Sequence, residues 1–256
     1  MSATPSQGSI PVLRATGLEK RFGAVVAATE VCLEVIAGER VSLIGSNGAG
    51  KTTFVNMITG YIKPDAGSIL LDDRDITGLE PRTINRMGVA RSFQIPQLYA
   101  ELSVLDNMLV ATACQDRHPS FWRQARSADA VERALALLAR FNLLEHAEQR
   151  VAGVPGGIRK LLDIAMALTV QPRLLLLDEP TSGVSVEEKF PMMDIVMHAL
   201  EQEVMTVLFV EHDMDIVERY ADRVVAFYSG RIIANDTPQI ALAAPDVRRY
   251  VTGTLH

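Results

Sequence analysis

The strongest chemical signal in the sequence is an eight-residue run, Gly45-Ser46-Asn47-Gly48-Ala49-Gly50-Lys51-Thr52, which matches the pattern G-x-x-x-x-G-K-[ST]. Glycines at these positions allow successive backbone N–H groups to turn toward one anion. A helix that begins at the end of such a loop adds its positive partial charge. The Lys51 ammonium can then reach the β and γ phosphates of a nucleotide, and the Thr52 hydroxyl can bind Mg²⁺. The run therefore predicts a nucleotide-binding loop, with Thr53 as its last member.

A second signal is an apolar run, 174–177, that ends in two adjacent carboxylates, Asp178 and Glu179. In an open parallel sheet the carboxyl ends of the strands face the ligand crevice. Asp178 would help to hold Mg²⁺, through a water molecule, and Glu179 would orient or deprotonate the water that attacks the γ phosphate. Taken alone, an Asp-Glu pair can also be a charged turn that caps a core strand. The phosphate loop favours the functional interpretation.

Strands and helices alternate at both ends of the chain, and a helical stretch separates the two ends. The hydrophobic pattern predicts strands within 12–39 and over 39–45, 68–73, 88–94, 173–178, 205–211 and 223–229, and helices over 50–60, 128–146, 159–169, 187–201 and 214–220. This order indicates an α/β fold with a mostly parallel sheet and an inserted helical lobe. Residues 1–10 show no periodicity and are expected to form a flexible lead-in.

Composition narrows the class of protein. The chain has 256 residues and a net charge of −6, and the acidic balance argues against binding to nucleic acid, which needs a basic surface. Two cysteines, Cys32 and Cys114, cannot build a disulfide framework. The mean hydropathy is +0.15, yet apolar runs such as 164–170 and 204–210 fall far short of the roughly 20 residues that a spanning helix needs. No secretion signal is visible, so we expect a soluble cytosolic protein.

Four stretches, 90–94, 154–168, 210–224 and 245–253, give the sequence its resemblance to a known family. From Leu18 to about Val251 the chain resembles the ATP-binding subunits of ABC transporters, most of all those of branched-chain-amino-acid-type importers, and lipopolysaccharide-exporter ATPases are the nearest rivals. The resemblance implies a phosphate-loop NTPase cassette with an antiparallel β region. Its RecA-like core would cover 11–94 and 166–256, and a helical signature subdomain would cover 95–165.

The resemblance also assigns roles to single residues. Phe22 would stack on adenine, and Gln94 and His212 would join Glu179 in the catalytic set. Mg²⁺ would be held by Thr52, Gln94 and Asp178, and Gly156 and Gly157 would contact the ATP bound by a second chain. From the residues alone, Phe22 could equally be a core aromatic, Gln94 an exposed loop amide and His212 a helix cap or a core histidine.

Three residues depart from the family pattern. Pro155 and Ile158 stand where the signature Leu-Ser-Gly-Gly-Gln has Ser and Gln, and Ser185 stands where an Asp or Asn is usual at a dimer contact. The hypothesis that follows is weaker closure of the dimer, or slower hydrolysis, than in a cassette with the usual residues.

The function that the resemblance implies is ATP hydrolysis that drives solute uptake of an amino acid or similar small organic acid. Its partners would be a second ATPase subunit, membrane permeases and, indirectly, a solute-binding protein. The permeases would dock at the loop 95–105 and the helical lobe, where apolar Ile95, Leu98, Tyr99 and Leu102 could make the contact or could equally pack within the lobe. The place would be the cytoplasmic face of a bacterial inner membrane. The alternatives are a lipid-type exporter, a poorly hydrolysing regulatory subunit, and an ATPase acting on DNA or ribosomes, which usually needs a second cassette or a coiled-coil insertion. A GTPase is disfavoured because no N-K-x-D motif is present. The solute itself cannot be read from the sequence.

Overall fold

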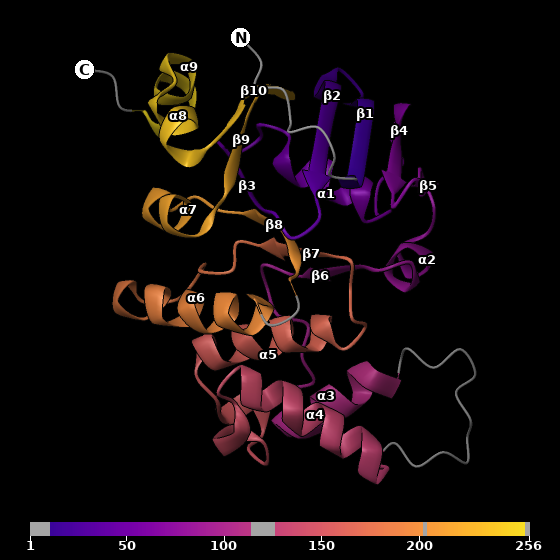
Figure 1. The fold of residues 1–256 in the computed structure, drawn as a ribbon, viewed down its shortest axis with the longest axis vertical. Helices are drawn as coiled ribbons and strands as arrows, with labels where there is room; N and C mark the ends of the chain where they lie inside the picture. Colours follow the sequence, from indigo (N-terminus) through magenta and orange to yellow (C-terminus); the bar gives the residue numbers. More distant parts are fainter. Residues whose placement is uncertain (1–10, 114–125, 202–203, 254–256) are drawn as a thin grey trace.

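Parallel strands run side by side at the centre of this structure, a computed structural model that describes residues 11–113, 126–201 and 204–253 (Figure 1). Within these residues the main sheet has the order β10-β9-β3-β8-β7-β6. Its strands are β3 (Arg40–Gly45), β6 (Val89–Ser92), β7 (Leu174–Asp178), β8 (Thr206–Val210), β9 (Arg223–Tyr228) and β10 (Arg231–Asp236). Every neighbouring pair is parallel except β9 with β10, which confirms the mostly parallel sheet.

A second, antiparallel sheet lies beside the first and has the order β2-β1-β4-β5. Its strands are β1 (Pro11–Phe22), β2 (Val25–Ile36), β4 (Ala66–Leu71) and β5 (Arg74–Asp75). In β2 the apolar residues Val31, Leu33 and Val35 alternate along the strand, and all three side chains are buried. The Thr29 N–H donates to the Gly230 carbonyl (2.8 Å), which ties this sheet to the turn between β9 and β10.

The run of four leucines in β7 is buried on both faces of the main sheet. Leu175 and Leu177 belong to a hydrophobic cluster shared with the helices below, and Leu174 and Leu176 to a cluster shared with the antiparallel sheet. Successive side chains of a strand point to opposite faces, so a continuous apolar run requires cover on both.

The helices are α1 (Lys51–Ile58), α2 (Pro81–Arg86), α3 (Val104–Ala113), α4 (Ala128–Arg140), α5 (Gly156–Leu168), α6 (Val186–Glu201), α7 (Met214–Tyr220), α8 (Pro238–Ala243) and α9 (Pro245–Val247).

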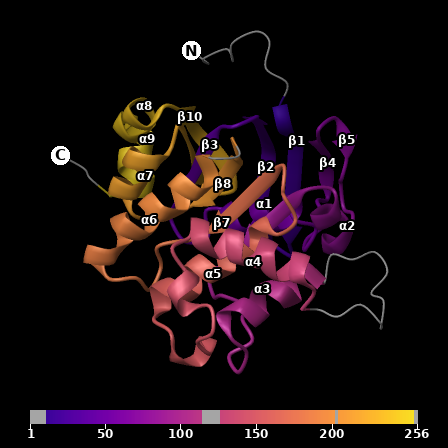
Figure 2. The ribbon, with the colours of Figure 1, turned by 60° about the horizontal axis from the view of Figure 1, so that its bottom comes forward.

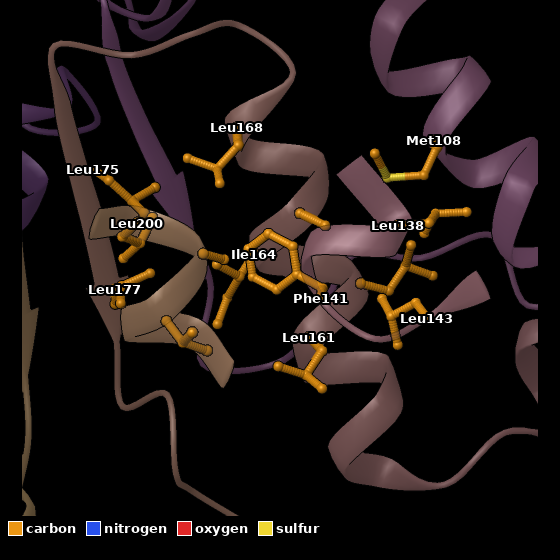
Figure 3. Close-up of a cluster of buried hydrophobic side chains, with 14 of the residues drawn as sticks. Met108, Leu138, Phe141, Leu143, Leu161, Ile164, Leu168, Leu175, Leu177 and Leu200 are labelled. Carbon is orange, nitrogen blue, oxygen red and sulfur yellow. The ribbon is translucent and has the colours of Figure 1, made fainter. Parts of the chain in front are cut away.

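Helices α3, α4 and α5 form the expected helical lobe, at the end of the molecule away from β1 and β2 (Figures 1 and 2). The lobe does not have a separate core. Figure 3 shows Met108 of α3 and Leu138 of α4 in one cluster with Ile164 of α5, and this cluster continues to Leu175 of β7 and Leu200 of α6. The shared core couples the lobe mechanically to the sheet, and the division at 95–165 stays a prediction.

Two predicted helix bounds need correction. The helix predicted over 128–146 ends at Arg140, because Asn142 adopts a left-handed φ of +56° that an α-helix cannot contain. Phe141 is fully buried all the same, since it caps the helix on the side of the lobe core. The helix predicted from Arg159 begins earlier, at Gly156, directly after Pro155. Proline lacks an N–H, so it fits where a helix begins and no backbone donor is needed.

Some expectations fall outside the described residues, namely the lead-in at 1–10 and the thiol of Cys114. In the part of the chain that the structure describes, no helix combines the length and the apolar character needed to cross a membrane.

Candidate nucleotide-binding site

The phosphate loop leaves β3 and enters α1, as its pattern requires. Two of its glycines sit where no other residue fits. Gly45 has φ +150°, and a Cβ there would lie 2.5 Å from the Phe227 carbonyl oxygen; Gly50 has φ +109°, and a Cβ would lie 2.6 Å from the Ala27 carbonyl oxygen. Real Cβ atoms do not approach backbone so closely, so β9 and β2 fix the path of the loop through these two positions.

Lys51 holds its charge inside the loop. Its side chain is buried, and the Nζ donates to the carbonyl oxygens of Gly45 (2.5 Å) and Ser46 (3.2 Å). Burial lowers the pKa of the ammonium group, and the carboxylates of Glu179 and Asp178 oppose this shift. A bound phosphate would therefore compete with the carbonyl oxygens of Gly45 and Ser46 for the ammonium group, which already lies against the loop.

The three residues expected to be catalytic meet at the carboxyl edge of the main sheet. Gln94 follows β6, Glu179 follows β7 and His212 follows β8, and these strands are neighbours in the sheet. The Gln94 Nε2 donates to Glu179 Oε2 (2.6 Å), and the His212 Nε2 lies 3.0 Å from Glu179 Oε1. The phosphate loop follows β3, which is the neighbour of β8 in the sheet. The same edge therefore carries the loop and the three side chains, as expected for a ligand crevice in a parallel sheet.

Glu179 adopts an unusual backbone conformation, with a φ of +48°. Such values are uncommon for residues other than glycine and persist where surrounding structure holds them. Here the Glu179 N–H donates to the Val210 carbonyl (3.0 Å), and the Ser182 N–H donates to the Glu179 carbonyl (3.1 Å). The turn after β7 thus aims the carboxylate between Gln94 and His212.

Asp178 is paired within the protein, which the sequence analysis missed. The Arg91 Nη2 donates to Asp178 Oδ2 (2.5 Å), and its Nη1 donates to Asn56 Oδ1 (2.7 Å). The guanidinium also lies over the rings of Tyr61 and Phe93, with its carbon 5.9 Å and 5.0 Å from their centroids. Asn56 and Tyr61, from α1 and the turn after it, and Phe93, two residues beyond Arg91, therefore hold the side chain of Arg91 against the carboxylate.

The donor set fits Mg²⁺ that is shared with a nucleotide. Among the described residues no group of three His, Cys, Asp or Glu could hold a metal ion alone. Mg²⁺ keeps several waters and is usually held by one or two carboxylates together with substrate phosphates. Asp178 offers such a carboxylate, and Thr52 is exposed at the start of α1. With Arg91 on Oδ2, contact through a water molecule matches the role expected for Asp178.

A buried carboxylate, Glu211, positions His212 and was also missed. It accepts the backbone N–H of His212 (2.9 Å), of Asp213 (3.3 Å) and of Thr181 (3.2 Å). Glu211 comes directly after β8. A charged residue at the end of a buried strand is costly unless it is hydrogen-bonded, and this was the sequence signal that could have identified Glu211. Its contacts join the turn that carries Glu179 to the turn that carries His212.

Phe22 lies at the tip of the β1–β2 hairpin, where its side chain is 48% exposed. The Nζ of Lys20 lies 5.7 Å from the centroid of its ring. This exposure rules out the reading of Phe22 as a core aromatic. A ring with an open face is what stacking on an adenine base requires.

We expect Phe22→Ala to weaken ATP binding and to leave kcat almost unchanged. Base–aromatic stacking is worth about 1–3 kcal/mol, so the dissociation constant should rise roughly 5- to 150-fold. Fluorescence titration with a labelled ATP measures this. Val25→Ala is the matched control, because Val25 pairs with Phe22 across the same hairpin and is also exposed. An affinity equal to that of the control variant would show that Phe22 does not stack on the base.

Gly156 and Gly157 open α5 at a groove of about 600 Å³ that is also lined by Gln94, Ser182 and Val184. A Cβ on either glycine would meet no atom within 4 Å. No hydrogen bond among the described residues joins this helix start to the phosphate loop of the same chain. Gly156 is exposed and Gly157 is half-buried, so the helix start lies at the surface, apart from the contacts that join the other predicted residues.

The family departures have local explanations. The Ser185 hydroxyl donates to Glu188 Oε2 (2.8 Å), and the Glu188 N–H donates to the Ser185 carbonyl (3.1 Å). These two contacts hold Ser185 to Glu188 across the first turn of α6. Ile158 is half-buried against the core of the lobe, and Pro155 occupies the position before α5. Each of the three residues therefore has a local structural role.

Comparisons with known proteins agree with this geometry. The family described as "ABC transporter" matches residues 28–182. The high-affinity branched-chain amino acid transport ATP-binding protein LivG of Escherichia coli K12 is 40% identical over 254 residues, covering 96% of this chain and 99% of that protein. BraF of Pseudomonas aeruginosa, which bears the same description, is 36% identical over 257 residues with the same coverage. The crystal structure of the ADP conformation of MJ1267, an ATP-binding cassette of an ABC transporter, is 31% identical, with a TM-score of 0.84 over 94% of this chain and 98% of that one. The chain therefore belongs to the ABC transporter family, as one of its ATP-binding cassettes.

Proposed function

We propose that the chain is the ATP-hydrolysing subunit of an importer for branched-chain amino acids or similar small organic acids. The observation that carries the proposal is the contact of Glu179 with both Gln94 and His212 beside the phosphate loop. Relatives named for branched-chain amino acid transport support this solute class, and they favour amino-acid transport over lipid export.

In the proposed reaction Glu179 accepts the proton of a water molecule as its oxygen attacks the γ phosphate in line with the leaving ADP. Gln94 and His212 hold the carboxylate and offer hydrogen-bonding groups to the water and to the γ phosphate. The Lys51 ammonium and the N–H groups of the loop stabilise charge on the transferred group. Mg²⁺, when bound with Asp178 and Thr52, supplies further charge neutralisation. Catalysis of this kind depends on positioning and electrostatics.

The second half of each site would come from a second cassette. Gly156 and Gly157 begin a helix of thirteen residues, present backbone N–H groups and have open space in front of them. A helix N-terminus favours a negatively charged group such as a γ phosphate. Two chains arranged head to tail would thus close around two ATP molecules, and hydrolysis would remove the bridge between them.

The permease subunits would dock at the cytoplasmic face of the membrane, beside the loop that follows β6 and carries Gln94 (the glutamine loop). Of the four apolar residues expected there, Ile95 and Tyr99 are 73% and 56% exposed. Leu98 packs against the core of the lobe, and Leu102 is half-buried. Ile95 and Leu98 line the groove that Gln94 also lines, so movement of a permease loop there would reach the catalytic set directly. A solute-binding protein would act through the permeases.

The uptake of labelled leucine tests the proposed function. Deletion of the gene in its host should abolish the ATP-dependent part of this uptake. Wild type and the exposed-site control Lys63→Met should restore it, and Lys51→Met should not. Uptake that survives deletion, together with a defect in outer-membrane lipid, would favour the exporter instead. Restoration by Lys51→Met would favour a subunit that regulates transport without hydrolysis.

A further inference from the structure

Helix α5 carries two buried charges one turn after its exposed glycine start. Lys160 is 4% exposed and Asp163 is 7% exposed. Neither belongs to the phosphate loop or to the three residues that meet at Glu179. Buried charges are expensive unless they are well bonded, so their partners indicate what they do.

Lys160 binds the backbone on both sides of the catalytic pair. Its Nζ donates to the carbonyl oxygens of Gln94, of Glu179 (3.2 Å) and of Phe93 (3.4 Å). An ammonium group has three donors, and each has an acceptor here. Burial lowers the pKa of Lys160, and nearby carboxylates, Asp163 foremost, oppose the shift. Lys160 is therefore a cation enclosed by the glutamine loop and the turn after β7.

These contacts close a ring. The Lys160 ammonium joins the backbone of Gln94 to the backbone of Glu179, and the side chains of the same two residues are joined by the 2.6 Å hydrogen bond. If the ammonium is removed, the side-chain hydrogen bond is the one direct link of this ring that remains between the two residues. Gln94 is exposed and follows a short edge strand, so its position depends on contacts of its loop with neighbouring elements.

Asp163 holds the glutamine loop to α5 from the other side. Its Oδ2 accepts the Ser92 hydroxyl (2.6 Å) and the Phe93 N–H (3.1 Å), and its Oδ1 accepts the Gln97 N–H (3.4 Å). Burial raises the pKa of this carboxyl, and these hydrogen bonds oppose the rise. The bonds span the whole segment 92–97, with Gln94 at its centre.

We propose that Lys160 and Asp163 are positioning residues that clamp segment 92–97 onto α5 and so keep Gln94 and Glu179 in reacting register. The proposal rests on the proposed function, because it concerns the geometry of ATP hydrolysis. It also ties the loop that carries Gln94 to α5, whose first residues, Gly156 and Gly157, would face a second chain in the proposed dimer. Neither residue touches the nucleotide in this scheme.

The test uses the full chain with Lys160→Met, which keeps the length of the side chain and removes its donors. Lys63→Met is the matched control, since Lys63 is exposed and remote. Misplacement of a catalytic group by about 1 Å can cost roughly 100-fold in rate, so we expect kcat to fall about 10- to 100-fold. The dissociation constant for Mg-ATP should change less than about twofold, because Lys160 has no contact with the phosphate loop.

A double variant separates positioning from general destabilisation. If Lys160 acts through Gln94, adding Lys160→Met to Gln94→Ala should lower kcat little further, because both changes remove the same function. Independent effects would multiply. A kcat for Lys160→Met within twofold of wild type, or losses that multiply, would overturn the proposal.

Asp163→Asn keeps the inference testable if Lys160→Met does not fold. An asparagine NH₂ cannot accept the Gln97 N–H, so we expect amide hydrogen exchange to speed up in peptides covering 92–97 and kcat to fall several-fold. Unchanged exchange and kcat would contradict the clamp. A wild-type chain that shows the slow exchange but no ATP turnover would contradict the proposed function and leave the clamp itself supported.

Discussion

Replacing Glu179 by Gln is expected to lower kcat for ATP hydrolysis by about 10²- to 10⁴-fold, the range that a general base contributes. The amide has nearly the shape of the carboxylate but cannot accept a proton from the attacking water. Gln94 and His212 would keep their positions, since each needs only a polar partner at 2.6–3.0 Å. Affinity for Mg-ATP should hardly change, because the loss is confined to the transition state.

Phosphate release under saturating Mg-ATP measures this effect. Glu187→Gln is the matched control, because Glu187 is an exposed carboxylate in the first turn of α6. Its turnover should equal that of wild type. If Glu179→Gln kept more than a tenth of wild-type turnover, another group would have to serve as the base.

Replacing Lys51 by Met should abolish useful nucleotide binding. Methionine preserves the buried stem of the side chain, but the loop loses the cation that faces the β and γ phosphates. Truncating one partner of a buried, hydrogen-bonded charge pair costs about 2–5 kcal/mol, which is roughly 30-fold or more in the dissociation constant. Turnover should fall below detection at ordinary ATP concentrations.

Titration of the purified variants with labelled ATP, together with their melting temperatures, distinguishes a loss of ATP binding from misfolding. Lys63→Met should bind as wild type does. The melting temperature of Lys51→Met without nucleotide should stay close to that of wild type. Wild type and Lys63→Met should gain stability when Mg-ATP is added, and Lys51→Met should not. Binding by Lys51→Met within threefold of wild type would contradict the role assigned to this lysine.

The parts of the site that could be predicted are those whose signal is local. The phosphate loop is specified by eight consecutive residues, and the four leucines before Asp178 indicate a strand covered on both faces. Glu179 directly follows a predicted strand, so the carboxyl-edge rule for parallel sheets places it at the ligand crevice. Gln94 and His212 were assigned through the family resemblance, and the structure places both in contact with Glu179.

The missed contacts join residues far apart in the chain. Arg91 and Asp178 are 87 positions apart in the sequence. Lys160 donates to the carbonyl of Gln94, which is 66 positions away. Nothing in one segment reveals a partner in the other, because the pairing depends on how α5 and β6 pack. The contact between Ser185 and Glu188 differs, since the two residues are three positions apart and an S-x-x-E sequence before a predicted helix is a readable local signal.

The hypothesis that Pro155, Ile158 and Ser185 weaken closure of the dimer stays a prediction. Ile158 packs inward and Ser185 is engaged with Glu188, so neither side chain is free to replace the polar contacts that the usual signature offers to a second chain. The backbone of Gly156 and Gly157 remains open. Closure would then depend mainly on helix N–H groups and on ATP itself.

The molar mass of the Glu179→Gln chain with and without Mg-ATP, measured by light scattering, tests most directly the claim that ATP bridges two cassettes. Without nucleotide the mass should be 28.0 kDa, and with saturating Mg-ATP it should approach about 56 kDa, twice that of one chain. Mg-ADP should leave it at the lower value. A mass that stays at 28.0 kDa while Mg-ATP is bound would contradict the account.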